Sequence, residues 1–189
     1  FTQTTDGTTL LENEVLKLEI SNKGGQIVEA KMKEFVTFDS IPVYLVKDGN
    51  ANFALNFTTS DNRVLSTADL YFEPSLTQSG DNKVLSMKAK VANGKFLEYR
   101  YEMKPNEYLV DFTIRSQGLN GVFNTSKPVT LEWDLKGIRH NKSVQYENRY
   151  TRLTYNHDDG DISKLVPKFP LDLRNKLSVI LDHFVQWFR

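Results

Sequence analysis

Three consecutive runs of alternating apolar and polar residues, within residues 84–115, constrain the fold more than any other feature of this chain. The runs VLSMKAKV (84–91) and FLEYRYEM (96–103) are separated by an Asn-Gly pair, the strongest short hairpin signal. A Pro-Asn-Glu turn then precedes the third run, YLVDFTIR (108–115). Because alternation with period two indicates strands with one buried face, we predict a three-stranded antiparallel meander here.

A second hairpin is predicted over LKLEISNKGGQIVEAKM, residues 16–32. Its two arms alternate in the same way, and they meet at a turn that contains Gly24 and Gly25. Glycine adopts positive φ without the steric cost of a Cβ atom, so two glycines allow a sharp reversal of the chain. We interpret the Gly-Gly pair as a turn without chemistry of its own.

Further strands complete the prediction. They are expected at IPVYLV (41–46), NFALNF (52–57), VTLEWDL (129–135) and, as one bent or bulged strand, SVQYENRYTRLTY (143–155). Residues 58–69 are polar and are expected to form a loop, and no helix is predicted within residues 10–160. Many short strands with tight turns and almost no helix predict an all-β sandwich of antiparallel strands.

The spacing of the apolar residues changes only at the end of the chain. After Pro170, apolar residues recur at helical spacing: Leu173, Leu177, Ile180, Leu181, Phe184 and Phe188. We therefore divide the chain into a polar leader or linker (1–9), a β domain (10–165) and a C-terminal amphipathic helix (166–189). The apolar stripe of that helix either packs on its own domain or faces a membrane surface.

Composition excludes several classes of protein. The 189 residues contain no cysteine, and 24 basic residues balance 24 acidic ones, which argues against a nucleic-acid binder that works by bulk charge. Disulfides and Cys-based zinc sites are excluded, although an extracytoplasmic location is not. No run of 18 apolar residues is present, so we expect none of these residues to span a membrane.

The sequence offers no recognised catalytic motif. Its three histidines, His140, His157 and His183, lack metal-ligand spacing, and the acidic turn at 157–161 lacks the glutamate that a calcium loop requires. We therefore predict no catalytic residue, no metal and no cofactor. Four residues are candidates for binding because of their exposed aromatic or cationic chemistry: Trp133, Arg139, His140 and Tyr150.

Three ordered stretches carry a resemblance to a known family. They are ENEVLKLEISNKGGQIVEAKM, FLEYRYEMKPNEYLVDFTIRSQGLN and ENRYTRLTYNHDDGDI. In their order and spacing they resemble the large periplasmic domain of the YidC membrane-protein insertases, in particular the Bacteroidetes-type members, over residues 10–165. The terminal segment departs from the family pattern, so it is either divergent or foreign to the native domain.

The resemblance implies a two-layer β-supersandwich of the galactose mutarotase-like kind, without enzymatic activity. It implies a location on the periplasmic side of the bacterial inner membrane, as one segment of a multi-pass protein that inserts and folds inner-membrane proteins. The implied role is that of an interaction or chaperone domain. The implied partners are the SecD/SecF complex of the Sec translocon and translocating membrane-protein chains, with no nucleic acid.

The alternative is a carbohydrate-binding or mutarotase-like domain of the same fold. Such an enzyme needs a histidine and a carboxylate that face one another, and His140 with Glu132 or Asp134 is the best candidate set. Trp133 would stack on the sugar. Adjacent residues of one strand point to opposite faces, however, so Trp133 and Glu132 would not share a site.

Overall fold

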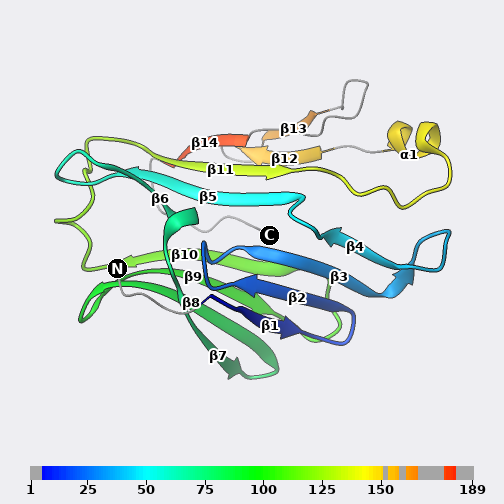
Figure 1. Ribbon diagram of the computed structural model, residues 1–189, viewed down its shortest axis with the longest axis horizontal. Coiled ribbons are helices and arrows are strands. Elements are labelled where there is room, and N and C mark those ends of the chain that lie inside the picture. Colours follow the sequence, from blue (N-terminus) through cyan, green and yellow to red (C-terminus); the bar gives the residue numbers. More distant parts are fainter. Residues whose placement is uncertain (1–5, 151–152, 158–160, 166–176, 182–189) are drawn as a thin grey trace.

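The computed structural model describes residues 6–150, 153–157, 161–165 and 177–181. Most of its regular structure is antiparallel strand, arranged as three four-stranded sheets in a sandwich-like stack with one separate hairpin (Figure 1). The predicted all-β sandwich is thereby confirmed.

The first sheet, here called the N-terminal sheet, has the strand order β1-β2-β3-β4. The predicted hairpin at residues 16–32 forms its centre, with Leu16, Leu18 and Ile20 buried on one face as their alternation requires. β1 begins inside the stretch that we assigned to a leader. The strands are β1 (Thr8–Glu12), β2 (Leu16–Ser21), β3 (Ile27–Val36) and β4 (Pro42–Val46).

The second sheet, the meander sheet, has the order β10-β9-β8-β7 and contains the three predicted strands. Tyr99 and Tyr101 of β9 are buried with Leu97 and Met103, so the period-two reading of this strand is confirmed. The polar β7 strand, which lies at the edge, was not predicted because its exposed side chains carry no alternation. The strands are β7 (Glu73–Ser79), β8 (Asn82–Ala92), β9 (Lys95–Met103) and β10 (Val110–Gln117).

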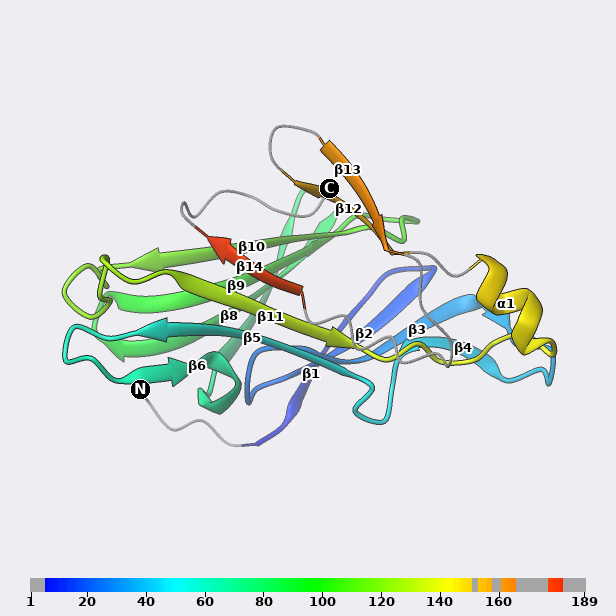
Figure 2. The same cartoon turned by 90° about the horizontal axis from the view of Figure 1, so that it is seen from above.

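The third sheet, the cover sheet, has the order β14-β11-β5-β6 and lies over the meander sheet (Figures 1 and 2). Its strands are β5 (Ala51–Thr58), β6 (Val64–Ser66), β11 (Val129–Leu135) and β14 (Leu177–Leu181). A short 3-10 helix, η1 (Thr67–Asp69), follows β6 in the stretch that we expected to be a loop. β12 (Leu153–His157) and β13 (Asp161–Leu165) form the separate hairpin.

The core is one cluster to which all three sheets contribute. Because a fully buried large apolar side chain stabilises a fold by roughly 1.5–3 kcal/mol, this shared cluster holds the layers together. Its fully buried members include Leu18 and Ile20 from the N-terminal sheet, Leu85, Met87 and Tyr99 from the meander sheet, and Leu55 from the cover sheet.

Gly25 does more than turn the chain. It has a φ of 64°, and a Cβ atom there would lie 3.0 Å from Cδ2 of Tyr99 and 3.1 Å from Cγ of Phe72. Its carbonyl oxygen accepts a 2.6 Å hydrogen bond from the buried Tyr101 hydroxyl. The turn of the N-terminal sheet therefore packs directly on the aromatic residues of the core.

Asn13, a buried residue in the turn between β1 and β2, joins two sheets. Its Oδ1 atom accepts hydrogen bonds from the backbone of Val15 and Leu16, which shapes its own turn. Its Nδ2 atom donates to the carbonyl oxygens of Lys104 and Glu107, each at 2.7 Å, in the turn between β9 and β10. One amide side chain thus satisfies backbone groups of both turns.

The structure also corrects the prediction of a bent strand over residues 143–155 and the prediction of no helix within residues 10–160. The bent strand predicted over 143–155 is wrong at its start, where Val144–Tyr150 form the helix α1. Ser143 caps this helix: its Oγ atom accepts from the amide of Tyr146, and its carbonyl oxygen accepts from the amide of Glu147. A serine before a helical turn is a known N-cap signal, and here it outweighs the weak alternation of the segment.

The helix predicted over 166–189 is not present at residues 177–181, which form strand β14. The remaining residues of that prediction lie outside the described part of the chain. In the sequence LSVIL, Leu177, Val179 and Leu181 are also spaced by two, and Val179 and Ile180 are β-branched, so the segment suits either structure. The segment forms a strand because it pairs with β11, where Val179 lies opposite Leu131.

Candidate functional site: an apolar patch at one end of the sandwich

The hairpin between β3 and β4 carries exposed apolar side chains at its end. A register shift after Met32 releases the strands from regular pairing, and a tight turn follows in which the Thr37 amide donates to the carbonyl oxygen of Ile41 at 2.7 Å. Phe35 and Phe38 are both about half exposed. Among the described residues, about half of the surface of each ring is left accessible to a partner.

Segment 136–140, which follows β11, lies along the outer edge of β4. The Lys136 amide donates to the carbonyl oxygen of Asn50 at 2.7 Å, and the Asn50 side chain donates to the carbonyl oxygens of Lys136 and Leu45. Further along, Nε2 of His140 donates to the carbonyl oxygen of Tyr44 at 2.8 Å. This tautomer follows because a carbonyl oxygen can only accept. His140 of the segment and Asn50 thus satisfy two carbonyl groups of β4 that an edge strand would otherwise present to solvent.

Helix α1 is held against the same segment. The Glu147 carboxylate accepts from the backbone amides of His140 at 2.9 Å and Asn141 at 3.4 Å. Its Oε1 atom also lies 4.0 Å from Nδ1 of His140. The Arg139 guanidinium lies 5.9 Å from the centre of the Phe38 ring, within cation–π range. Hairpin, segment and helix thus form one end of the molecule (Figures 1 and 2).

Tyr108, in the turn before β10, extends this end. Its ring centre lies 5.9 Å from that of Phe35, and its hydroxyl donates to Oε2 of Glu34 at 2.7 Å. The Glu34 carboxylate, which accepts this hydrogen bond, raises the pKa of Tyr108 above its usual value. The neighbouring Leu109 is 68 % exposed.

These side chains form what we call the distal patch. In the described part of the chain, nine of the twelve exposed large hydrophobic residues belong to it, while Leu10, Val64 and Leu76 lie elsewhere. A concentration of exposed apolar surface at one end of a domain marks an interaction site. The members of the patch are Phe35, Val36, Phe38, Ile41, Leu45, Tyr108, Leu109, Val144 and Tyr146.

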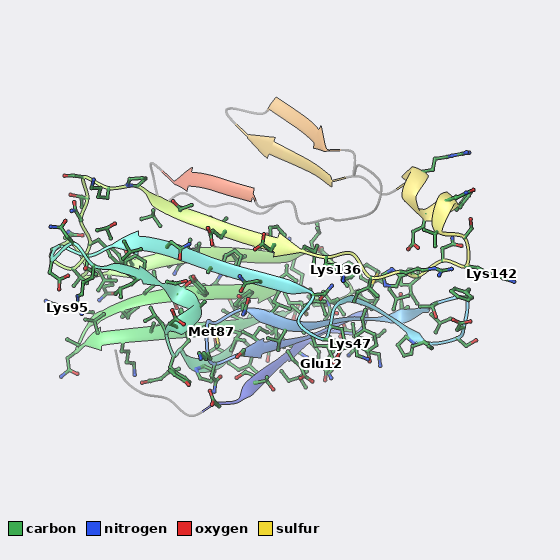
Figure 3. All side chains as sticks on the ribbon, turned by 45° about the horizontal axis from the view of Figure 1, so that its top comes forward. Glu12, Lys47, Met87, Lys95, Lys136 and Lys142 are labelled. Atoms are coloured by element: carbon green, nitrogen blue, oxygen red, sulfur yellow. The ribbon has the colours of Figure 1, made fainter. Side chains whose placement is uncertain are left out.

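Positive charge borders the distal patch. Between residues 136 and 149, four cations stand against one carboxylate, Glu147, so this stretch has a net charge of +3 (4 − 1) in a chain whose net charge is zero. Figure 3 shows Lys142 at this end of the molecule and Lys95 at the opposite end. The hairpin itself adds the acidic residues Glu34 and Asp39. The four cations are Lys136, Arg139, Lys142 and Arg149.

The four binding candidates from the sequence are divided by the structure. Arg139 and His140 lie beside the distal patch, between β4 and α1. Tyr150 is the last residue of α1. Trp133 lies within β11, paired with Phe53 of β5, and is not brought to the other three. Their role in binding stays a prediction.

The phenylalanines of the hairpin were missed by sequence reasoning. The stretch EFVTFDSI (34–41) places two of them on either side of Val36-Thr37 and just before an Asp-Ser turn. Aromatic residues so close to a turn have few neighbours that could bury them, and this was the available signal.

In the part of the chain that the structure describes, no group of three or more His, Asp and Glu residues could hold a metal ion. No helix among the described residues is long and apolar enough to cross a membrane. The carboxylate that the structure places beside His140 is Glu147, which already accepts from two backbone amides. This arrangement holds the chain in place.

Comparison with known proteins decides the family. The family model described as the YidC periplasmic domain matches residues 9–168. The chain belongs to the YidC periplasmic domain family. Two relatives are both 35 % identical: one from Parabacteroides distasonis over 162 residues, 85 % of this chain, and one from Phocaeicola vulgatus over 156 residues, 81 % of this chain. A relative from Porphyromonas gingivalis is 33 % identical over 82 % of the chain.

All three relatives are named membrane protein insertase YidC, and the resemblance to Bacteroidetes-type members is confirmed. The matched region covers 24–25 % of each relative, so the chain spans about a quarter of the length of these YidC proteins. No solved structure matches the chain.

Proposed function

We propose that this YidC-family domain is a non-catalytic interaction and chaperone module, which assists the insertion and folding of inner-membrane proteins. The observation that carries the proposal is the distal patch, which holds nine of the twelve exposed large hydrophobic residues of the described chain. A module that works by contact needs such a surface, whereas an enzyme needs converging acid and base groups.

The proposed setting is the periplasmic side of the inner membrane, within a longer insertase. Translocating membrane-protein chains and the SecD/SecF complex are the proposed partners of that insertase. The family membership supports this setting, because the relatives are named as membrane protein insertases.

A mutarotase-like activity has weaker support. It would require a free carboxylate opposite His140, yet Glu147 is engaged by backbone amides and His140 donates to the carbonyl oxygen of Tyr44. These bonds favour a structural role for both side chains. Calorimetric titration with galactose and glucose is expected to give no heat of binding; saturable heat that His140→Ala abolishes would favour the enzyme.

The proposed function is tested in a full-length insertase that carries this domain, reconstituted in proteoliposomes with a model membrane protein. The paired change Phe38→Asp and Ile41→Asp places charge on the distal patch, and we expect at least a several-fold loss of insertion. The matched control is Val64→Asp with Leu76→Asp, at residues outside the patch that are at least as exposed. Equal insertion by the two variants would refute the proposal.

A further inference from the structure

The distal patch has the composition of a surface that meets a lipid interface. Aromatic rings with a polar tip, such as Tyr108 and Tyr146, favour the boundary between headgroups and acyl chains. The Tyr108 ring lies 5.9 Å from that of Phe35, and the exposed side chains of Phe38 and Ile41 belong to the same hairpin, which projects from one end of the molecule (Figure 2). Interfacial protein segments combine apolar side chains with neighbouring cations in this way.

The charges around the patch are complementary to anionic headgroups. Segment 136–149 carries a net charge of +3 directly beside the apolar hairpin, and its exposed cations include Lys142 and Arg149. The acidic residues Glu34 and Asp39 of the hairpin oppose deep burial. This balance suits shallow contact with a headgroup layer.

The edge of β4 argues against an extended peptide as the occupant. Peptides commonly bind a sheet by adding a strand to an open edge, where unpaired carbonyl groups accept their hydrogen bonds. Here the carbonyl oxygens of Tyr44 and Leu45 are already taken by His140 and Asn50. The apolar side chains beside that edge are therefore exposed without a strand-addition site.

We propose that the distal patch docks this domain on an anionic lipid surface. The side chains of the hairpin enter the boundary between headgroups and acyl chains, and the cations of segment 136–149 bind lipid phosphates. This inference rests on the proposed function in one respect, because it assigns a partner to the same patch. In this arrangement, the end of the domain that holds the hairpin and α1 faces the membrane.

Sedimentation of the 189-residue chain with vesicles tests the inference. Vesicles of phosphatidylglycerol and phosphatidylethanolamine are compared with vesicles of phosphatidylcholine alone. We expect binding to the anionic vesicles that weakens with added salt. The paired change Phe38→Ser and Ile41→Ser should raise the lipid concentration for half-binding at least about tenfold, because both side chains lose apolar contact. The control pair is Val64→Ser with Leu76→Ser, and we expect it to behave as the parent chain.

The charge contribution is tested separately. Lys142→Gln with Arg149→Gln should weaken binding to anionic vesicles by about fivefold for each charge removed. Lys95→Gln with Lys127→Gln removes the same charge from exposed sites at the start of β9 and in the loop before β11, and it should change binding less than twofold. All these residues are exposed, so each variant should keep the thermal unfolding midpoint of the parent chain.

The outcomes separate this inference from the proposed function. No sedimentation with anionic vesicles, or equal binding by the patch and control variants, overturns lipid docking. The patch variant could reduce insertion activity although the parent chain does not bind vesicles. In that case a translocating chain or another protein binds the distal patch, and the proposed function stands. If vesicle binding depends on the patch but insertion does not, lipid docking stands and the proposed function fails.

Discussion

Replacing Gly25 by alanine should destabilise the domain more than the same change at any turn glycine in open surroundings. The left-handed conformation, with φ at 64°, costs a non-glycine residue about 1–2 kcal/mol. The new methyl group would also lie 3.0 Å from Cδ2 of Tyr99 and 3.1 Å from Cγ of Phe72. Both rings are fully buried and have no room to move, so overpacking should add about 1–3 kcal/mol. The expected total is about 2–5 kcal/mol.

Gly49 provides the matched control. Its φ is 73°, close to that of Gly25, but no atom lies within 4 Å of the position that a Cβ atom would occupy. Gly49→Ala therefore carries only the conformational cost, and the difference between the two variants isolates the steric cost. Urea unfolding followed by circular dichroism measures both free energies of unfolding. Equal destabilisation of the two variants would refute the argument that Gly25 is required by its contact with the aromatic core.

Two further predictions concern polar contacts. Asn13→Asp should lower the free energy of unfolding by about 2–3 kcal/mol, because a carboxylate oxygen would replace the amide that donates to two carbonyl groups. Asn50→Asp makes the same replacement at a solvent-exposed pair of carbonyls and should cost less; equal losses in urea unfolding would contradict this. Hydrogen bonds from Asn82 and Arg100 hold the pKa of Glu102 below its usual 4.5. The ionised carboxylate therefore stabilises the fold fully above pH 4.5, and this stabilisation is lost as the pH falls through the pKa of Glu102 in the folded state. Glu102→Gln should therefore show a flatter acid limb of stability against pH, and parallel curves for variant and parent would contradict it.

The elements that were predicted correctly are those whose evidence is local. In β9, Tyr99 and Tyr101 alternate with charged residues, and this pattern alone indicates a strand with one buried face. The Asn-Gly pair before β9 likewise marks a turn by its own chemistry. Where two patterns coexist, as in the segment 177–181, local evidence leaves both helix and strand open. The neighbouring strand β11 decided between them.

The candidate site was predicted only in part. Arg139 and His140 stand out by their chemistry, and both lie beside the distal patch. Phe35 and Phe38 stand out less by their chemistry, because phenylalanine is more often buried than exposed. Both lie beyond the register shift that follows Met32, which the alternation of the sequence does not encode.

The sequence by itself determined most of the strands, their tight turns and the resemblance to the family, because alternation, turn residues and ordered motifs are properties of neighbouring positions. Only the tertiary structure decided which apolar side chains stayed outside the core. Three segments far apart in the chain come together at one end of the sandwich: the hairpin contacts Tyr108 through Phe35 and Arg139 through Phe38. Their meeting depends on strand pairing and sheet packing between distant residues. For that physical reason the patch is visible in the fold and not in the sequence.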